Sequence, residues 1–199
     1  MNEAKLEKFL KEKILPEIEK GRGGFDGIHT LEVVDWVKKI IDHNPELGLD
    51  RIVMIIAAYA HDWGYSSIFK DGQVMNFDLI EGAKTLHMEL GAKKLEELLK
   101  DKFFEFLRKE QKERCVHLVA VHDRKFEIDK VDEIVLMEAD VLSGLDINGN
   151  KPILDKQSNE KFLDSIINIR MPKFITDYSK KEATKLIQAR EKFFEGGLR

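Results

Sequence analysis

The sequence has little cysteine, little proline, no excess of positive charge and no long hydrophobic run. The single cysteine, Cys115, excludes an internal disulfide, and its apolar neighbours predict a buried structural thiol in a reducing compartment. The net charge of −4 disfavours a general nucleic-acid or membrane-surface binder. The longest apolar run, 52–60, is far shorter than the roughly 20 residues that span a membrane. The first residues are charged and lack the apolar region of a signal peptide, so we expect a soluble, cytoplasmic protein.

With only four prolines and many Glu, Lys, Leu and Ala residues, the sequence favours helix nearly everywhere. Apolar residues recur at helical spacing, and no stretch is convincing as a strand. We therefore expect an all-α bundle. The expected helices, besides the one that ends at His61-Asp62, cover residues 3–20, 28–42, 78–99, 102–122, 130–143, 158–169 and 178–194.

The length of 199 residues suits one domain with a helical extension. We expect an N-terminal helix within residues 1–24, a central domain over 25–150, and a C-terminal helical extension over 151–199 packed on the same domain. The turn-forming stretch DINGNKP marks the second boundary.

The most informative feature is the pair His61-Asp62, which follows the most hydrophobic segment of the chain, RIVMIIAAYA. Apolar residues nearly all round predict a helix at the centre of a bundle, with Asp50 as its N-cap. An imidazole and a carboxylate are costly there without a partner. Adjacent helical residues point about 100° apart, so both reach one ion only where the helix ends, which we expect at Gly64. A divalent cation would satisfy both groups; the alternative is a hydrogen-bonded core histidine beside a polar helix end.

Two other residues suggest the same ion. His29 lies at the start of an amphipathic helix, and Asp140 lies among apolar neighbours in LMEADVLSGLD, where a carboxylate needs a counter-charge. Two imidazoles and two carboxylates suit Mn, Fe, Co, Ni, Zn or Mg. Four ligands leave positions open on a six-coordinate ion, as a catalytic site requires.

In this order and context, His29, His61-Asp62 and Asp140 resemble the H…HD…D signature of the HD-superfamily metal-dependent phosphohydrolases. The resemblance covers about residues 25–150. It implies an HD-domain helical bundle, here with additional C-terminal helices, and hydrolysis of phosphate esters by metal-activated water. It also implies that these four residues are the metal ligands, with Asp62 in the catalytic centre.

The string HMELGA, from His87, is similar to an element of family members that hold two metals, and His122 is similar to their later histidine. Val121 stands where those proteins often have another histidine, so we favour one tightly bound ion. A second ion on His87 and His122, bridged by Asp62, stays open. The alternative is that both histidines contact the phosphate and offset its charge.

Of the remaining histidines, His117 is expected to be structural, and His43 is expected at an exposed helix end. Arg124 and Lys125 follow His122, and Lys70 lies in the loop after the central helix. These cations are candidates to bind a phosphate, although loop cations are often only solvated.

The motifs of alarmone and cyclic-di-GMP hydrolases are absent from residues 63–66 and 123–126. A nucleotide or another small phosphomonoester is therefore the expected substrate. Two alternatives are a di-iron HD-fold oxygenase and a non-catalytic metal- or nucleotide-binding module. The sequence leaves a homodimer open.

Overall fold

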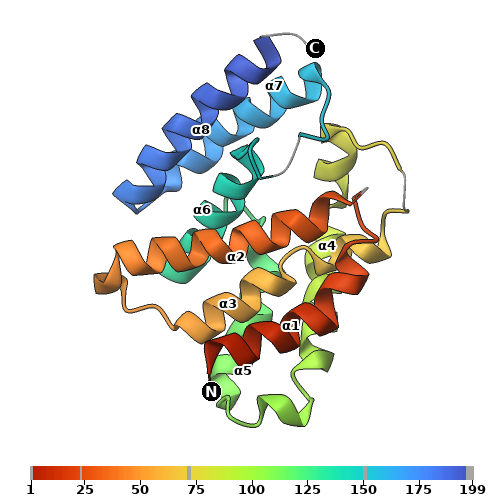
Figure 1. Cartoon of the computed structure of the whole chain (residues 1–199), viewed down its shortest axis with the longest axis vertical. Coiled ribbons are helices and arrows are strands. Elements are labelled where there is room, and N and C mark those ends of the chain that lie inside the picture. Colours follow the sequence, from red (N-terminus) through yellow and green to blue (C-terminus); the bar gives the residue numbers. More distant parts are fainter. Residues whose placement is uncertain (1, 23, 71–72, 150–151, 196–199) are drawn as a thin grey trace.

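The computed structural model describes residues 2–22, 24–70, 73–149 and 152–195. Over these ranges the chain forms eight α-helices and no strand, so the expected all-α fold is confirmed (Figure 1). No helix in this part of the chain has a stretch long and apolar enough to cross a membrane. The α-helices are α1 (Glu3–Ile18), α2 (Phe25–His43), α3 (Arg51–Ala60), α4 (Phe77–Leu98), α5 (Lys109–Val121), α6 (Val131–Leu145), α7 (Lys156–Ser165) and α8 (Asp177–Glu195).

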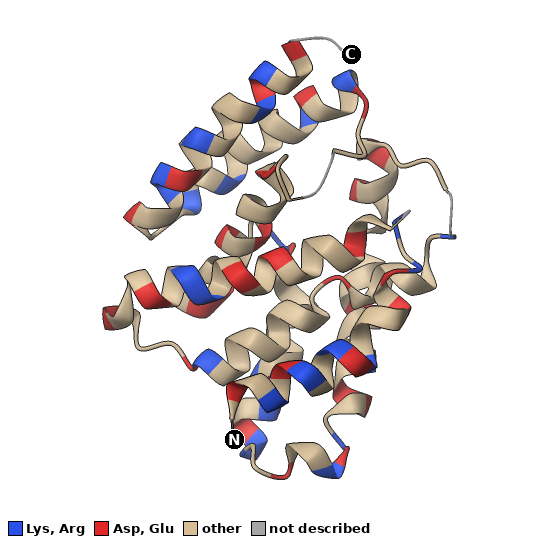
Figure 2. Ribbon diagram, viewed as in Figure 1, with Lys and Arg blue, Asp and Glu red and all other residues tan. Residues whose placement is uncertain are grey.

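Helix α3 lies at the centre of the bundle. Every residue from Val53 to Ala60 is at most 3% exposed, and the helix packs against α1, α2 and α5. In Figure 2 its ribbon is tan along almost its whole length, whereas α1 and α8 carry charges of both signs. The carboxylate of Asp50 accepts hydrogen bonds from the backbone N–H groups of Ile52 and Val53, which confirms the expected N-cap.

Helix α3 ends at Ala60, earlier than expected, and Gly64 has a different role. Gly64 lies in a short 3-10 turn, η2 (Trp63–Ser67), that packs on α4. A Cβ atom at Gly64 would lie 1.9 Å from the carbonyl oxygen of His87, so only glycine fits there. This close approach fixes His87 beside the residues that end α3.

Two other expected helices have different bounds. The segment 102–122 is divided into a 3-10 turn, η3 (Lys102–Phe104), and α5, because Asp101 caps the turn and Phe104 and Leu107 are buried between the two. The segment 158–169 is α-helical only to Ser165 and continues as a π-helix, η4 (Ile166–Arg170).

The C-terminal helices pack beside the central ones. Helix α8 contacts α6 and α2, and α7 contacts α4. The carboxylate of Glu138 in α6 accepts hydrogen bonds from the backbone N–H groups of Ile175 and Thr176 and from the Thr176 hydroxyl, at 2.6, 3.1 and 2.6 Å. These bonds hold the start of α8 against α6. Residues 150–151 of the expected boundary lie outside the described residues.

Candidate metal centre

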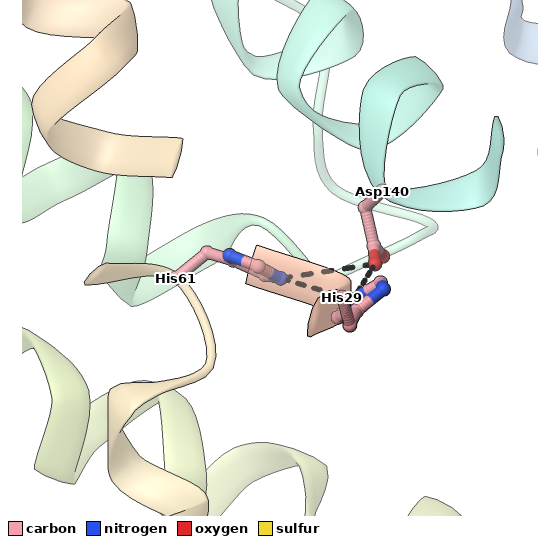
Figure 3. Close-up of side chains that lie close together, drawn as sticks. All are labelled: His29, His61 and Asp140. Carbon is pink, nitrogen blue, oxygen red and sulfur yellow. Dashed lines mark hydrogen bonds and ion pairs between the residues drawn. The ribbon is translucent and has the colours of Figure 1, made fainter. Parts of the chain in front are cut away.

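The first group of ligands comes from three helices. His29 lies in the first turns of α2, His61 directly after α3, and Asp140 in α6 (Figure 3). The Nε2 atom of His29 lies 3.1 Å from Asp140 Oδ1 and 3.3 Å from His61 Nε2. Asp62 Oδ2 lies 3.4 Å from the Nε2 atom of His29 and 3.3 Å from that of His61. The structure thus brings together the four residues that the sequence suggested as ligands.

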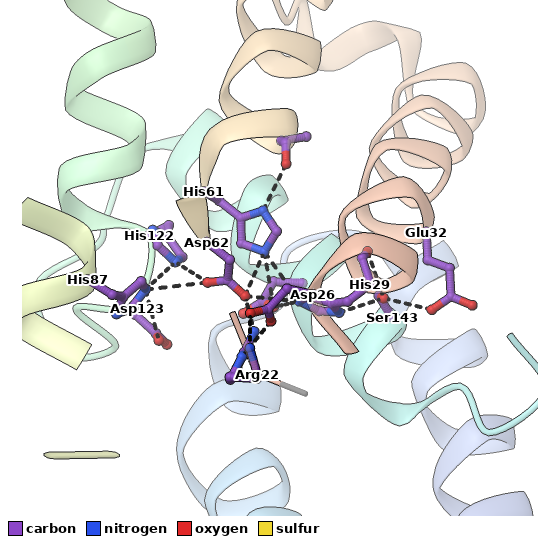
Figure 4. A network of polar contacts seen from close by, with 12 residues as sticks. Arg22, Asp26, His29, Glu32, His61, Asp62, His87, His122, Asp123 and Ser143 are labelled. Atoms are coloured by element: carbon purple, nitrogen blue, oxygen red, sulfur yellow. Dashed lines mark hydrogen bonds and ion pairs between the residues drawn. The ribbon is translucent and has the colours of Figure 1, made fainter. Parts of the chain in front are cut away.

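A second group faces the other oxygen of the same carboxylate (Figure 4). Asp62 Oδ1 lies 3.4 Å from His87 Nε2 and 3.5 Å from His122 Nε2, and these two nitrogens lie 3.2 Å apart. His87 belongs to α4, and His122 follows α5. Each group of three, one with Asp140 and one with Asp62, has an arrangement that could hold an ion.

The outer ring nitrogens show which atoms are left to bind a metal. His61 Nδ1 lies 2.8 Å from the carbonyl oxygen of Ala58, and His122 Nδ1 lies 2.9 Å from that of Val119. A carbonyl oxygen only accepts, so both Nδ1 atoms carry a proton, and in a neutral ring Nε2 keeps its lone pair. In that neutral form the Nε2 lone pairs face the oxygens of Asp62, and a divalent metal between them would take both as ligands, so these residues fit a metal.

The charges at the centre support the same conclusion. Burial alone would lower the pKa of His29, but the carboxylates of Asp140 and Asp62 outweigh it and raise that pKa to about 9. Burial would raise the pKa of Asp62, but the charges of His61 and Arg22 hold it well below its usual range. Without a metal, a proton on His29 therefore supplies positive charge that an ion would otherwise provide.

The imidazole of His29 is oriented from behind. Its Nδ1 atom lies 2.8 Å from the hydroxyl oxygen of Ser143, and that oxygen lies 3.0 Å from Glu32 Oε2. A polar partner behind a metal-binding histidine fixes the orientation of the ring. His87 differs, because its buried Nδ1 atom has no hydrogen-bond partner among the described residues. Its ring is instead held by stacking on Tyr65, with centroids 3.9 Å apart.

A cavity of about 790 Å³, its open mouth included, lies over the centre. His29, Asp62 and Asp140 line it, and so do the cations of Arg22, Lys84 and Arg170.

Each of these three cations contacts a carboxylate at the centre. Arg22 donates a hydrogen bond to Asp62, and Arg170 donates to Asp140 at 3.1 Å and also to Asp123. Lys84 Nζ lies 3.2 Å from Asp123 Oδ1. The cations therefore lie beside the carboxylates of the centre and on the wall of the cavity.

The sequence does not predict four further residues at the centre: Arg22, Lys84, Arg170 and Asp123. Asp123 directly follows His122, so its neighbour could have indicated it, whereas Arg22 lies in the glycine-rich turn before α2 and had no such signal. Arg170 lies beyond the expected end of the central domain and had no such signal. Of the cations that the sequence suggested, Lys70 is exposed, Arg124 pairs with Glu127, and Lys125 pairs with Glu81. None of those three is among the residues that line the cavity.

The remaining polar residues lie where expected. Cys115 is buried. His43 is exposed at the end of α2 and stacks on Tyr178. The Nε2 atom of His117 lies 2.9 Å from Glu133 Oε1, which is consistent with a structural role.

Comparison with known protein families finds a match over the central helices. The family model described as HD domain matches residues 27–145. Neither a curated protein nor a solved structure matches the chain. The matched range contains both groups of candidate ligands, whereas Arg22 precedes it and Arg170 follows it. The expected fold, an HD-domain helical bundle with additional C-terminal helices, is confirmed by this match and by the observed helices.

Proposed function

The chain belongs to the HD domain family, and on that premise we propose that it hydrolyses a small phosphate ester with metal-activated water. The domain implies the superfamily of metal-dependent phosphohydrolases. The observation that carries the proposal is the position of Asp62, which lines the cavity together with three cations and whose two oxygens face two separate groups of imidazoles.

We propose two ion positions that share Asp62. His29, His61 and Asp140 would hold one ion, and His87 and His122 would hold the other. This differs from the preference for one ion that the sequence suggested, because both oxygens of Asp62 are directed at imidazole nitrogens. Nitrogen and oxygen ligands suit Mn, Fe, Co, Ni, Zn or Mg. When bound, such ions lower the pKa of a coordinated water towards neutrality and polarise a phosphoryl oxygen.

The chain's own residues bind and orient the phosphoryl group. Arg22 and Arg170 are nearly fully buried. Their guanidinium groups donate hydrogen bonds to Asp62, Asp123 and Asp140, which hold them in place before the substrate arrives. Fixed donors of this kind stabilise charge that develops on transferring oxygens, because they need no reorganisation during the reaction. Lys84 adds a third positive charge to the same wall.

The cavity also favours this function over the two alternatives. A di-iron oxygenase has no need of three cations over its metals, whereas a phosphate ester does. A non-catalytic module has no need of a complete ligand set beside an open cavity.

Phosphate release tests the proposal. The chain should be stripped of metal, reconstituted separately with each candidate ion, and screened against nucleotides and small phosphomonoesters. We expect release with at least one ion, loss of release with a chelator, and recovery when the ion is returned. A fully loaded protein that releases phosphate from none of these compounds would refute the proposal.

A further inference from the structure

A fourth cation lines the same cavity but lacks the partners of the other three. Arg190 of α8 is 3% exposed and lies on the cavity wall. Its Nε atom donates to Asn159 Oδ1 at 2.5 Å, and its Nη1 atom donates to the carbonyl oxygen of Gly144 at 2.7 Å. Both acceptors are neutral.

The contrast with the other cations is one of charge. Arg22, Lys84 and Arg170 each form an ion pair with one or more carboxylates. No carboxylate in the described part of the chain forms an ion pair with Arg190, which instead lies over the rings of Phe162 and Phe194, at 4.8 and 5.8 Å from their centroids. A buried charge is costly unless a counter-charge compensates it.

Arg190 is charged at neutral pH all the same. Burial lowers its pKa to about 10, which is still well above neutrality. Among the described residues, two neutral acceptors and two aromatic rings surround the guanidinium, and no carboxylate pairs with it. A ligand group in the cavity can supply a negative charge.

The distance to the metal centre is short enough for one small molecule. Gly144, which accepts from Arg190, lies one helical turn after Asp140 in α6, a rise of about 6 Å. Apolar side chains, among them Val141, Ile166 and Phe162, line the same cavity. The cavity therefore combines carboxylates of the candidate metal centre, apolar side chains and the guanidinium of Arg190.

We propose that Arg190 binds a second anionic group, a carboxylate or a phosphate, on the leaving group of the substrate. The preferred substrates are then phosphate esters in which an apolar body separates two anionic groups. This inference rests on the proposed function, because it places the scissile phosphate at the metal centre.

Matched phosphonates test this inference by calorimetry on the metal-loaded protein, without turnover. The probes are phenylphosphonate and its para-carboxylate, para-carboxamide and para-phosphonate derivatives, none of which carries a phosphate ester bond. The wild-type chain should bind the para-carboxylate about tenfold more tightly than the neutral carboxamide, as expected for a charge-assisted hydrogen bond.

Two variants distinguish an effect of Arg190 itself from an effect of the overall positive charge of α8. Arg190→Met should abolish the difference between carboxylate and carboxamide, while Lys185→Met, which removes an exposed cation from the same helix, should keep it. Equal affinity of the wild-type chain for carboxylate and carboxamide would overturn the role of Arg190 and leave the proposed function standing. Failure of every phosphonate to bind would overturn both. The wild-type comparison decides even where Arg190→Met does not fold.

Discussion

A substitution at His87 tests whether the centre holds two metal ions or one. It belongs only to the group that faces Asp62 Oδ1. We therefore expect His87→Ala to lower the metal content, measured by elemental analysis after reconstitution, from about two ions per chain to about one. Removal of His117, a partly exposed histidine paired with Glu133, should leave the content unchanged.

The contrary result would assign His87 a different role. If His87→Ala kept the full metal content and only raised KM or lowered kcat, this histidine would contact the phosphate and not a metal.

Arg170 should matter for the rate and not for the metal content. It contacts Asp140 and Asp123 from the wall of the cavity, where its positive charge would face a transferring phosphoryl group. We expect Arg170→Gln to lower kcat about 100-fold, as loss of one fixed donor typically does. Arg124→Gln, at an exposed arginine paired with Glu127, is the control and should keep wild-type kinetics. A similar loss in both variants would show that the phosphate binds outside the cavity described above.

At the residue scale, the sequence could indicate the candidate ligands but not the cations around them. His61 and Asp62 stand out because they follow the most apolar helix, and His29 and Asp140 lie in equally clear helical contexts. Arg22 reaches Asp62 across forty positions, and Arg170 reaches Asp123 across forty-seven. Such contacts arise from tertiary packing alone, and the local sequence pattern does not indicate them.

Among the elements, the contact between η2 and α4 controls the second group of ligands. A methyl group at Gly64 would lie 1.9 Å from the His87 carbonyl oxygen, so the turn and the helix would have to separate. We expect Gly64→Ala to lower the free energy of unfolding by about 1–3 kcal/mol or more and to reduce metal binding at His87. Chemical denaturation measures the first effect and elemental analysis the second.

Gly82, which lies in α4, provides a control. A Cβ atom there would meet nothing within 4 Å. Gly82→Ala should therefore stabilise the chain by about 0.5–1 kcal/mol, because alanine favours helix. If Gly64→Ala were equally harmless, the close packing of η2 on α4 would not determine where His87 lies.

Glu138 stabilises another contact between elements, that of α6 with the start of α8. It accepts three hydrogen bonds from residues that begin α8, so its loss leaves buried donors without partners. We expect Glu138→Ala to lower the free energy of unfolding by about 2–4 kcal/mol. Glu160→Ala, at an exposed position of α7, should have no measurable effect in the same denaturation experiment. Equal stability of the two variants would contradict this role for Glu138.

At the element scale, periodicity predicted where the helices lie but not how they end. The segment 102–122 is divided because a tight turn buries Phe104 and Leu107. Helical periodicity does not distinguish such a turn from one continuous helix. The π-helix at the end of α7 places Arg170 in the cavity, and its extra residue per turn has no sequence signature of its own.

On the scale of the whole molecule, the cavity is built from more than the matched domain. Residues 27–145 supply both groups of candidate ligands. The segment that follows supplies Arg170, Arg190 and the apolar side chains of Phe162 and Ile166, which also line the cavity. We therefore infer that the C-terminal helices select the substrate, while the matched domain supplies the metal centre.

On the proposal above, the Asp62 carboxylate would hold two divalent ions, one at each oxygen. Anomalous diffraction from crystals grown with Mn²⁺, collected to locate the metal, tests it most directly. We predict two anomalous peaks, one on each side of the Asp62 carboxylate, the first beside His61 and the second beside His87. A single peak at full metal loading would contradict the bridging role of Asp62, and an absence of any peak at this carboxylate would contradict the metal centre itself.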